Sequence, residues 1–187
     1  MLDTGNMIYC SKCGAKGVIR QVPEGDNRER NICSSCDSIF YENPRLIVGC
    51  LVHNDQQVLL CRRAIEPRYG YWTIPAGFME NGESAEQGAL RETLEEAQAQ
   101  VTLERLFSLY SIIHINQVYL TFLARLEGDD FGAGNESLEV RWFDCEEIPW
   151  DEIAFSAVKH ALMKWVDEDR GATKTHLEVF NKDESKF

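Results

Sequence analysis

The segment from Gly77 to Ala99 constrains the fold of this chain more than any other. It begins with a loop that contains Gly77 and Gly82, and it continues into a helical pattern over residues 84–97. At about 100° per residue, three glutamates of that helix fall at roughly 0°, 300° and 40° and so share one face. They are Glu92, Glu95 and Glu96. Carboxylates this close repel one another, and Mg²⁺ or Mn²⁺ would relieve the repulsion because hard oxygen ligands suit these ions. A solvated acidic helix face is the alternative.

Four of the seven cysteines form two pairs near the N-terminus. Cys10 and Cys13 form one pair, Cys33 and Cys36 form the other, and nineteen residues separate them. Two such pairs match a tetrahedral four-cysteine zinc site, whereas a thioredoxin-like redox motif would need one pair beside a βαβ unit. We therefore expect a small zinc ribbon over residues 7–40, with structural zinc supplying its folding energy. Its positive and negative charges nearly balance, which favours a stabilising or interface module over nucleic-acid binding.

Strand-like and helical patterns alternate after the turn at Asn43-Pro44. The expected strands are residues 46–53, 58–63, 71–75, 101–113, 117–126 and 139–143, with an edge strand at 176–180. The expected helices are residues 84–97 and 155–166. Strands mixed with two separate helices favour an α/β (α+β) domain with helices on both faces of a mixed sheet. We assign residues 45–170 to this domain and 171–187 to a C-terminal extension, with a disordered tail from Lys182.

The segment that begins at Gly77 resembles the Nudix box, in which a glycine, a glutamate and an Arg-Glu-x-x-Glu-Glu run recur at set intervals. The residues in register are Gly77, Glu83, Arg91, Glu92, Glu95 and Glu96. Gln98 stands where the box has its last glycine, and Thr93 where it has a bulky apolar residue. The resemblance covers about residues 45–165. With the four cysteines added, the chain resembles a zinc-ribbon subgroup of Nudix hydrolases that includes the plant chloroplast FAD and ADP-ribose pyrophosphatase.

The resemblance implies a Nudix α/β/α sandwich that hydrolyses the diphosphate of a nucleoside diphosphate derivative. It implies that the Gly77 carbonyl joins Glu92, Glu95 and Glu96 in holding catalytic Mg²⁺ or Mn²⁺. It also implies an ion pair in which Glu83 braces the helix through Arg91.

The general base of Nudix enzymes is a box glutamate in some members and a loop glutamate in others. Glu136 and Glu139 are the loop candidates in this chain. Glu92 and Glu95 are the candidates within the box. Glu139 could equally be a structural salt-bridge partner, since it begins a strand.

The expected substrate is FAD or ADP-ribose, cleaved to AMP plus FMN or ribose 5-phosphate. NADH is disfavoured, because NADH pyrophosphatases carry a Ser-Gln-Pro-Trp-Pro-Phe-Pro run where residues 106–111 read Leu-Phe-Ser-Leu-Tyr-Ser. The candidates for substrate contact are Arg62, Arg63, Arg68, Tyr69 and Phe78. Surface ion pairs for the arginines and core packing for the aromatics are the alternatives. An NADH or other dinucleotide pyrophosphatase, or a non-enzymatic nucleotide sensor, remains as another interpretation of the whole chain.

The overall charge limits the partners. The formal net charge is −12, which disfavours long nucleic acid and anionic membranes and leaves a small-molecule nucleotide. The longest apolar run, residues 46–52, is far too short to span a bilayer, and the N-terminus has no signal-peptide pattern. We expect a cytoplasmic protein, and family resemblance alone suggests a homodimer.

Overall fold

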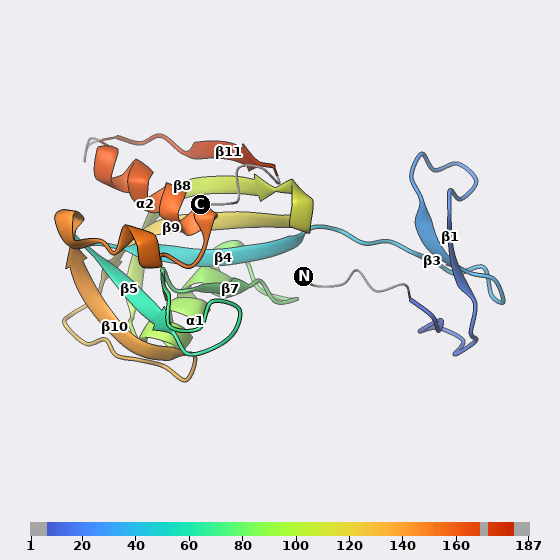
Figure 1. Ribbon diagram of the computed structural model, residues 1–187, viewed down its shortest axis with the longest axis horizontal. Helices are drawn as coiled ribbons and strands as arrows, with labels where there is room; N and C mark the ends of the chain where they lie inside the picture. Colours follow the sequence, from blue (N-terminus) through green and yellow to red (C-terminus); the bar gives the residue numbers. More distant parts are fainter. Residues whose placement is uncertain (1–6, 169–171, 182–187) are drawn as a thin grey trace. The chain divides into compact units, whose positions relative to one another are not determined.

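The computed structural model describes residues 7–168 and 172–181, and the chain divides into two compact units, Met1–Asn43 and Pro44–Phe187 (Figure 1). The start of the N-terminus and the tail from Lys182, on which two of the expectations above rest, lie outside the described residues. The predicted domain limits of 7–40, 45–170 and 171–187 stay predictions.

The first unit is a three-stranded antiparallel sheet with little apolar core. Its strands are β1 (Val18–Gln21), β2 (Arg30–Cys33) and β3 (Ile39–Phe40), in that spatial order. Ile32 is buried, whereas other aliphatic side chains of the unit are exposed: Ile8, Ile19, Val22 and Ile39. So small a buried apolar surface cannot offset the entropy of ordering the chain, and a second source of stability is needed.

The second unit contains two sheets. One is antiparallel and has the order β10 (Ser137–Asp144), β5 (Gln57–Arg63), β6 (Trp72–Thr73). The other has the order β11 (His176–Phe180), β8 (Val101–Ile112), β9 (Gln117–Leu126), β4 (Arg45–Val52), β7 (Ala76–Phe78). Within it β11 runs parallel to β8 and β4 runs parallel to β9, while the other pairs are antiparallel. The predicted mixed sheet is confirmed.

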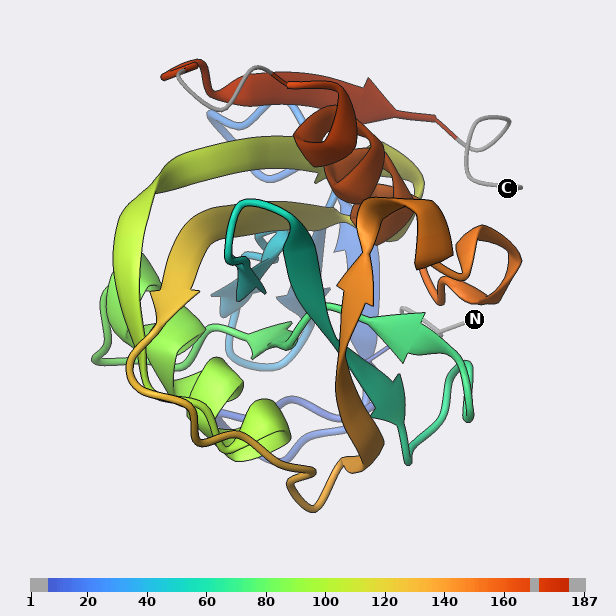
Figure 2. The ribbon, with the colours of Figure 1, turned by 90° about the vertical axis from the view of Figure 1, so that its left-hand side faces the viewer.

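The helices α1 (Ala85–Ala97) and α2 (Ser156–Asp167) lie on opposite sides of β4, as Figures 1 and 2 show. Successive side chains of a strand point to opposite faces, so β4 contributes to two cores. Val48, Cys50 and Val52 pack in the cluster that includes Ala89 and Ala97 of α1. On the other face, Leu51 belongs to the cluster that contains Val158, Leu162 and Trp165 of α2. The predicted arrangement of helices on both faces is confirmed. Neither helix has the length and hydropathy needed to cross a membrane, within the part of the chain that the structure describes.

The strand expected at 71–75 is present but shorter, as Trp72–Thr73. The structure has a short β6 in one sheet and a separate β7, which was not predicted, in the other. Pro75 lies between them and has no N–H to donate to a ladder, although its carbonyl accepts the N–H of Cys50 at 3.1 Å. The chain therefore changes sheets at Pro75. This crossing places β7 beside α1, where the glutamates lie. Three single turns of 3₁₀ helix complete the unit: η1 (Ile113–Ile115), η2 (Cys145–Glu147) and η3 (Trp150–Glu152).

Candidate active site

The helix α1 begins with a capping box. The Ser84 hydroxyl accepts the Gln87 N–H at 3.2 Å, and the Gln87 side chain accepts the Ser84 N–H at 2.8 Å. Two otherwise unpaired N–H groups are satisfied in this way, which sets the start of the helix and hence the direction of every later side chain. Glu92 and Glu96 consequently point toward β7, with 13% and 5% exposure, while the side chain of Glu95 is 58% exposed.

Glu96 is the most buried of these carboxylates. Its Oε2 accepts the backbone N–H of Ala76 at 3.0 Å. Burial raises the pKa of Glu96 to about 7, and the negative charges of Glu92 and Glu136 add to the rise. Burial also raises the pKa of Glu92. Two neighbouring carboxylates that lose hydration in this way are costly unless a positive charge is supplied.

Gly77 leaves room for the Glu92 carboxylate. A Cβ at position 77 would lie 2.4 Å from Oε2 of Glu92, much closer than atoms of two residues can approach. Any larger residue at this position would therefore displace the Glu92 carboxylate from its place against the strand. The absence of a side chain keeps the strand backbone and the carboxylate side by side.

Arg91 holds the carboxylates from outside. It forms a bidentate pair with Glu83, with Nη2 at 2.8 Å from Oε1 and Nε at 3.0 Å from Oε2. Its Nη1 also donates to Glu92 Oε1 at 2.7 Å and to Glu95 Oε2 at 3.1 Å. The Arg91 guanidinium lowers the pKa of Glu83 to about 2. One arginine thus compensates part of the negative charge at this end of α1.

A divalent cation is the cofactor that the resemblance implies, and the donor set fits it. The donors are hard carboxylate oxygens. Because Gly77 has no side chain, the backbone of β7 lies directly against the Glu92 carboxylate, and we call this arrangement the Gly77 cradle. In this arrangement, however, one oxygen of Glu92 and one of Glu95 each accept a hydrogen bond from Arg91. Among the described residues, the four cysteines are the only group of three or more His, Cys, Asp or Glu side chains whose potential ligand atoms all lie within 4.8 Å of one another.

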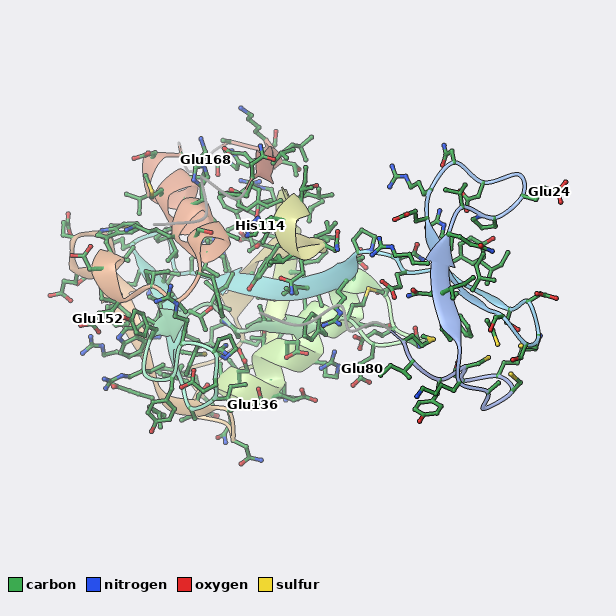
Figure 3. The ribbon with its side chains drawn as sticks, turned by 45° about the vertical axis from the view of Figure 1, so that its right-hand side comes forward. Glu24, Glu80, His114, Glu136, Glu152 and Glu168 are labelled. Carbon is green, nitrogen blue, oxygen red and sulfur yellow. The ribbon has the colours of Figure 1, made fainter. Side chains whose placement is uncertain are left out.

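The two loop candidates have different surroundings. Glu136 lies in the loop before β10, on the same side of the domain as α1 (Figure 3). The N–H of Gly134, two residues before Glu136, donates to the Glu96 carbonyl at 3.0 Å, which places this loop against the box helix. The charge of Glu136 adds to the rise in pKa that burial causes in Glu92 and Glu96. Glu139 instead lies on β10 opposite Arg62, with its Oε2 4.0 Å from Nη1 of that arginine. The structure therefore brings the loop of Glu136 to the box helix and pairs Glu139 elsewhere.

The predicted substrate contacts have varied surroundings. Arg62 and Arg63 donate through Nε to the carbonyls of Gly70 and Pro67, both at 2.9 Å, and so tie down the loop between β5 and β6. Arg63 is buried, with its guanidinium 5.0 Å from the Phe155 ring centre. Arg68 stacks on Tyr71. Tyr69 and Phe78 are exposed. The first two arginines are thus occupied by the protein itself, and the role of all five residues stays a prediction.

Sequence reasoning missed two contacts of the site. The N–H of Ala76 that binds Glu96 carries no signal in the sequence, because every residue other than proline has such a group. The Gln98 side chain binds the loop that carries Glu136, through Nε2 to the Ala133 carbonyl at 3.0 Å. The sequence did contain one indication of this contact, because Gln98 stands where the box has its last glycine.

The four cysteines of the first unit form a separate cluster. The Sγ atoms of Cys10 and Cys36 lie 3.7 Å apart, as do those of Cys13 and Cys33. These distances are too long for disulfides and suit the edges of a tetrahedral metal site. The backbone N–H of Cys13 lowers the pKa of the Cys10 thiol, and the Ser38 hydroxyl lowers that of Cys36 to about 6. Both effects favour the thiolate at these two positions. At Cys13 the backbone N–H of Ala15 acts in the same direction, but the sulfurs of Cys36 and Cys10 outweigh it and raise the pKa to about 12.

Comparisons with known proteins agree with this geometry. Residues 43–166 match the NUDIX domain, and residues 9–42 match the Nudix N-terminal zinc ribbon. The chain belongs to the Nudix family. It is 28% identical over 181 residues to a protein of Vibrio atlanticus named NAD-capped RNA hydrolase NudC, covering 94% of this chain and 64% of that relative. The chain therefore spans less than two thirds of that relative's length.

Two further similarities cover two thirds of the chain and nearly all of it, respectively. A Methanocaldococcus jannaschii protein named ADP-ribose pyrophosphatase is 28% identical over 134 residues, covering 67% of this chain and 77% of the relative. The crystal structure of a NUDIX hydrolase from Nitrosomonas europaea is 50% identical, with a TM-score of 0.89, and covers 94% of this chain and 100% of that one. The predicted family and its N-terminal zinc-ribbon module are confirmed.

Proposed function

We propose that this chain is a divalent-metal-dependent pyrophosphatase that cleaves the diphosphate between an adenosine moiety and a second group. The observation that carries the proposal is that two carboxylates of α1 are turned onto β7, where Glu96 accepts the Ala76 N–H at 3.0 Å and Glu92 lies against Gly77. Such a concentration of negative charge beside a Gly77 cradle is typical of a cation site and is costly otherwise.

The residues have separate roles in this proposal. Glu92, Glu95, Glu96 and the Gly77 carbonyl would hold Mg²⁺ or Mn²⁺, and the bound cation would neutralise charge on the phosphoryl oxygens. Arg91, oriented by Glu83, donates to one oxygen each of Glu92 and Glu95, and these oxygens would be available to the cation once Arg91 no longer donates to them. The general base is Glu136, which accepts a proton from the attacking water. Water adds to one phosphorus, the bond from that phosphorus to the bridging oxygen breaks, and two phosphomonoesters leave.

The substrates we propose are FAD and ADP-ribose, which share an ADP group. A relative named ADP-ribose pyrophosphatase supports the second of these. A dinucleotide of the NAD type is the alternative substrate, because other relatives are named NAD-capped RNA hydrolase. A nucleotide sensor would have no need of clustered carboxylates. Structural zinc on the four cysteines, a homodimer, a cytoplasmic location and the absence of nucleic-acid partners stay part of the proposal.

A chromatographic product assay tests the activity. FAD, ADP-ribose and NADH are offered separately at equal concentration, with Mg²⁺ and then with a chelator. We expect AMP together with FMN or ribose 5-phosphate, and no cleavage without the metal. Faster cleavage of NADH would overturn the substrate proposal, and no cleavage of any of the three by protein with bound metal would overturn the activity.

A further inference from the structure

The C-terminal end of α1 is bonded to the loop that precedes β10, and this contact rests on Gln98, the residue that departs from the Nudix box. The last carbonyl groups of a helix have no partner within the helix. Here the Ala97 carbonyl accepts the N–H of Gly132 at 2.8 Å, and the Glu96 carbonyl accepts the N–H of Gly134 at 3.0 Å. The loop therefore satisfies the helix end through its backbone.

Gln98 adds the one side-chain bond of this contact. It has left-handed backbone angles, φ 48° and ψ 28°, and its N–H donates to the Leu94 carbonyl at 3.0 Å, which closes the helix. This conformation normally favours glycine, which the box has at the position. A glycine would lack the amide that donates to the Ala133 carbonyl at 3.0 Å. Glutamine is less favourable than glycine in this backbone conformation, but its side chain provides a hydrogen bond to the loop.

The backbones of the helix end and of the loop are in close contact. A Cβ at Gly134 would lie 1.7 Å from the Glu95 carbonyl oxygen, so the two backbones touch. Two residues further on, the Glu136 carbonyl accepts the N–H of Ala64 at 2.8 Å, and the N–H of the next residue, Ser137, donates to the Gly134 carbonyl at 3.1 Å. The loop around Glu136 is thus bonded on one side to Ala64, the residue that follows β5, and on the other side, through Gly132 and Gly134, to the end of α1.

We propose that Gln98 is a positioning residue that clamps the loop of residues 132–136 to the end of α1 and so sets Glu136 beside Glu92 and Glu96. The inference rests on the proposed function, because Glu136 is the general base there. The bond joins the element that carries the metal ligands to the loop that carries the base. A small displacement of a catalytic group is enough to slow the reaction, so the clamp acts on turnover more than on substrate binding.

The test replaces Gln98 with the glycine of the box. In Gln98→Gly we expect kcat to fall about three- to tenfold with KM unchanged, because one hydrogen bond to the loop is lost. The urea midpoint should stay equal or rise, because glycine prefers these backbone angles. Gln98→Lys, which retains a donor on a long side chain, should recover most of the turnover. Gln100→Ala, which removes an exposed glutamine two residues away, is the control and should match the wild type.

A double variant and hydrogen exchange separate positioning from a general loss. In a protein that already carries Glu136→Gln, adding Gln98→Gly should not lower kcat any further, because the base that Gln98 positions has been removed. Multiplicative losses, or an unchanged kcat in Gln98→Gly, would overturn the proposal. The proposed function fails separately if no nucleotide is hydrolysed or Glu136→Gln is fully active. Hydrogen exchange in the free protein then tests whether Gln98 holds the loop, independently of any activity. Faster exchange over residues 132–137 in Gln98→Gly supports this role, and unchanged exchange overturns it.

Discussion

Glu92 and Glu96 are held where a glutamate on an ordinary acidic helix would not lie. Both are turned inward against β7, and Glu96 receives a backbone N–H while Glu92 receives an arginine. The helical spacing was enough to predict that these carboxylates share a face with Glu95. It could not show that two would be buried and one exposed, since that depends on where β7 crosses the helix.

The first prediction at this scale concerns Glu96→Gln. The amide oxygen can still accept the Ala76 N–H, so the fold and the urea midpoint should be preserved. The loss of one negative ligand should lower kcat by about a hundredfold or more. Steady-state kinetics beside urea denaturation make the comparison, with Glu146→Gln, an exposed glutamate of η2, as the matched control. Turnover near that of the wild type would exclude Glu96 as a metal ligand.

A second residue-scale prediction concerns Gly77→Ala. The added methyl group would meet the Glu92 carboxylate at 2.4 Å and push it away from the strand. We expect the affinity for Mn²⁺, measured by titration calorimetry, to fall about tenfold or more while the thermal midpoint changes little. Wild-type affinity for Mn²⁺ in this variant would show that the cradle has no part in holding the cation.

At the scale of elements, the two units depend on different sources of stability. The domain that contains α1 and α2 has two apolar clusters, one against each helix. The first unit buries little beyond Ile32, Cys10 and Cys33, and its strands are two to four residues long. Metal binding is the remaining source of folding energy for a module of this kind. The spacing of the cysteines was sufficient to predict the cluster, because each pair is local.

The prediction that belongs to this scale is Cys33→Ser. A serine oxygen is a poor replacement for one of four thiolates, so the variant should lose bound zinc and the ordered structure of residues 7–42. Zinc content by atomic absorption and amide exchange over β1 and β2 measure the two effects. Cys145→Ser, which changes a thiol outside the cluster, should keep about one zinc per chain. A folded variant with normal zinc would refute the four-cysteine assignment.

At the scale of the whole molecule, the charge decides what the chain can attract. With a net charge of −12, the protein has no general attraction for a polyanion, whereas a diphosphate can be bound locally through a cation. Relatives named for action on NAD-capped RNA make this a useful distinction. The charge of the chain favours a free nucleotide over a nucleotide attached to RNA.

The corresponding prediction is that a single-stranded RNA of about twenty nucleotides, without a cap, will not be retained in filter binding at about 150 mM salt. The same preparation should hydrolyse a free nucleotide, which shows that the protein is intact. Retention that weakens steeply with added salt would instead assign a nucleic-acid surface to this chain. Comparison with Cys33→Ser would then locate that surface on or off the first unit.

The sequence by itself determined the features that depend on neighbours along the chain. The helical repeat places Glu92, Glu95 and Glu96 on one face, the cysteine pairs lie in tight turns, and alternating patterns predict most strands within one or two residues. Only the tertiary structure decided which residues from distant segments meet. It placed the loop of Glu136 against the end of α1 and Glu139 opposite Arg62, split residues 72–78 between two sheets, and turned Gln98 toward Ala133. The physical reason is that local spacing follows from backbone geometry, whereas these contacts depend on how two sheets and a loop pack around one helix.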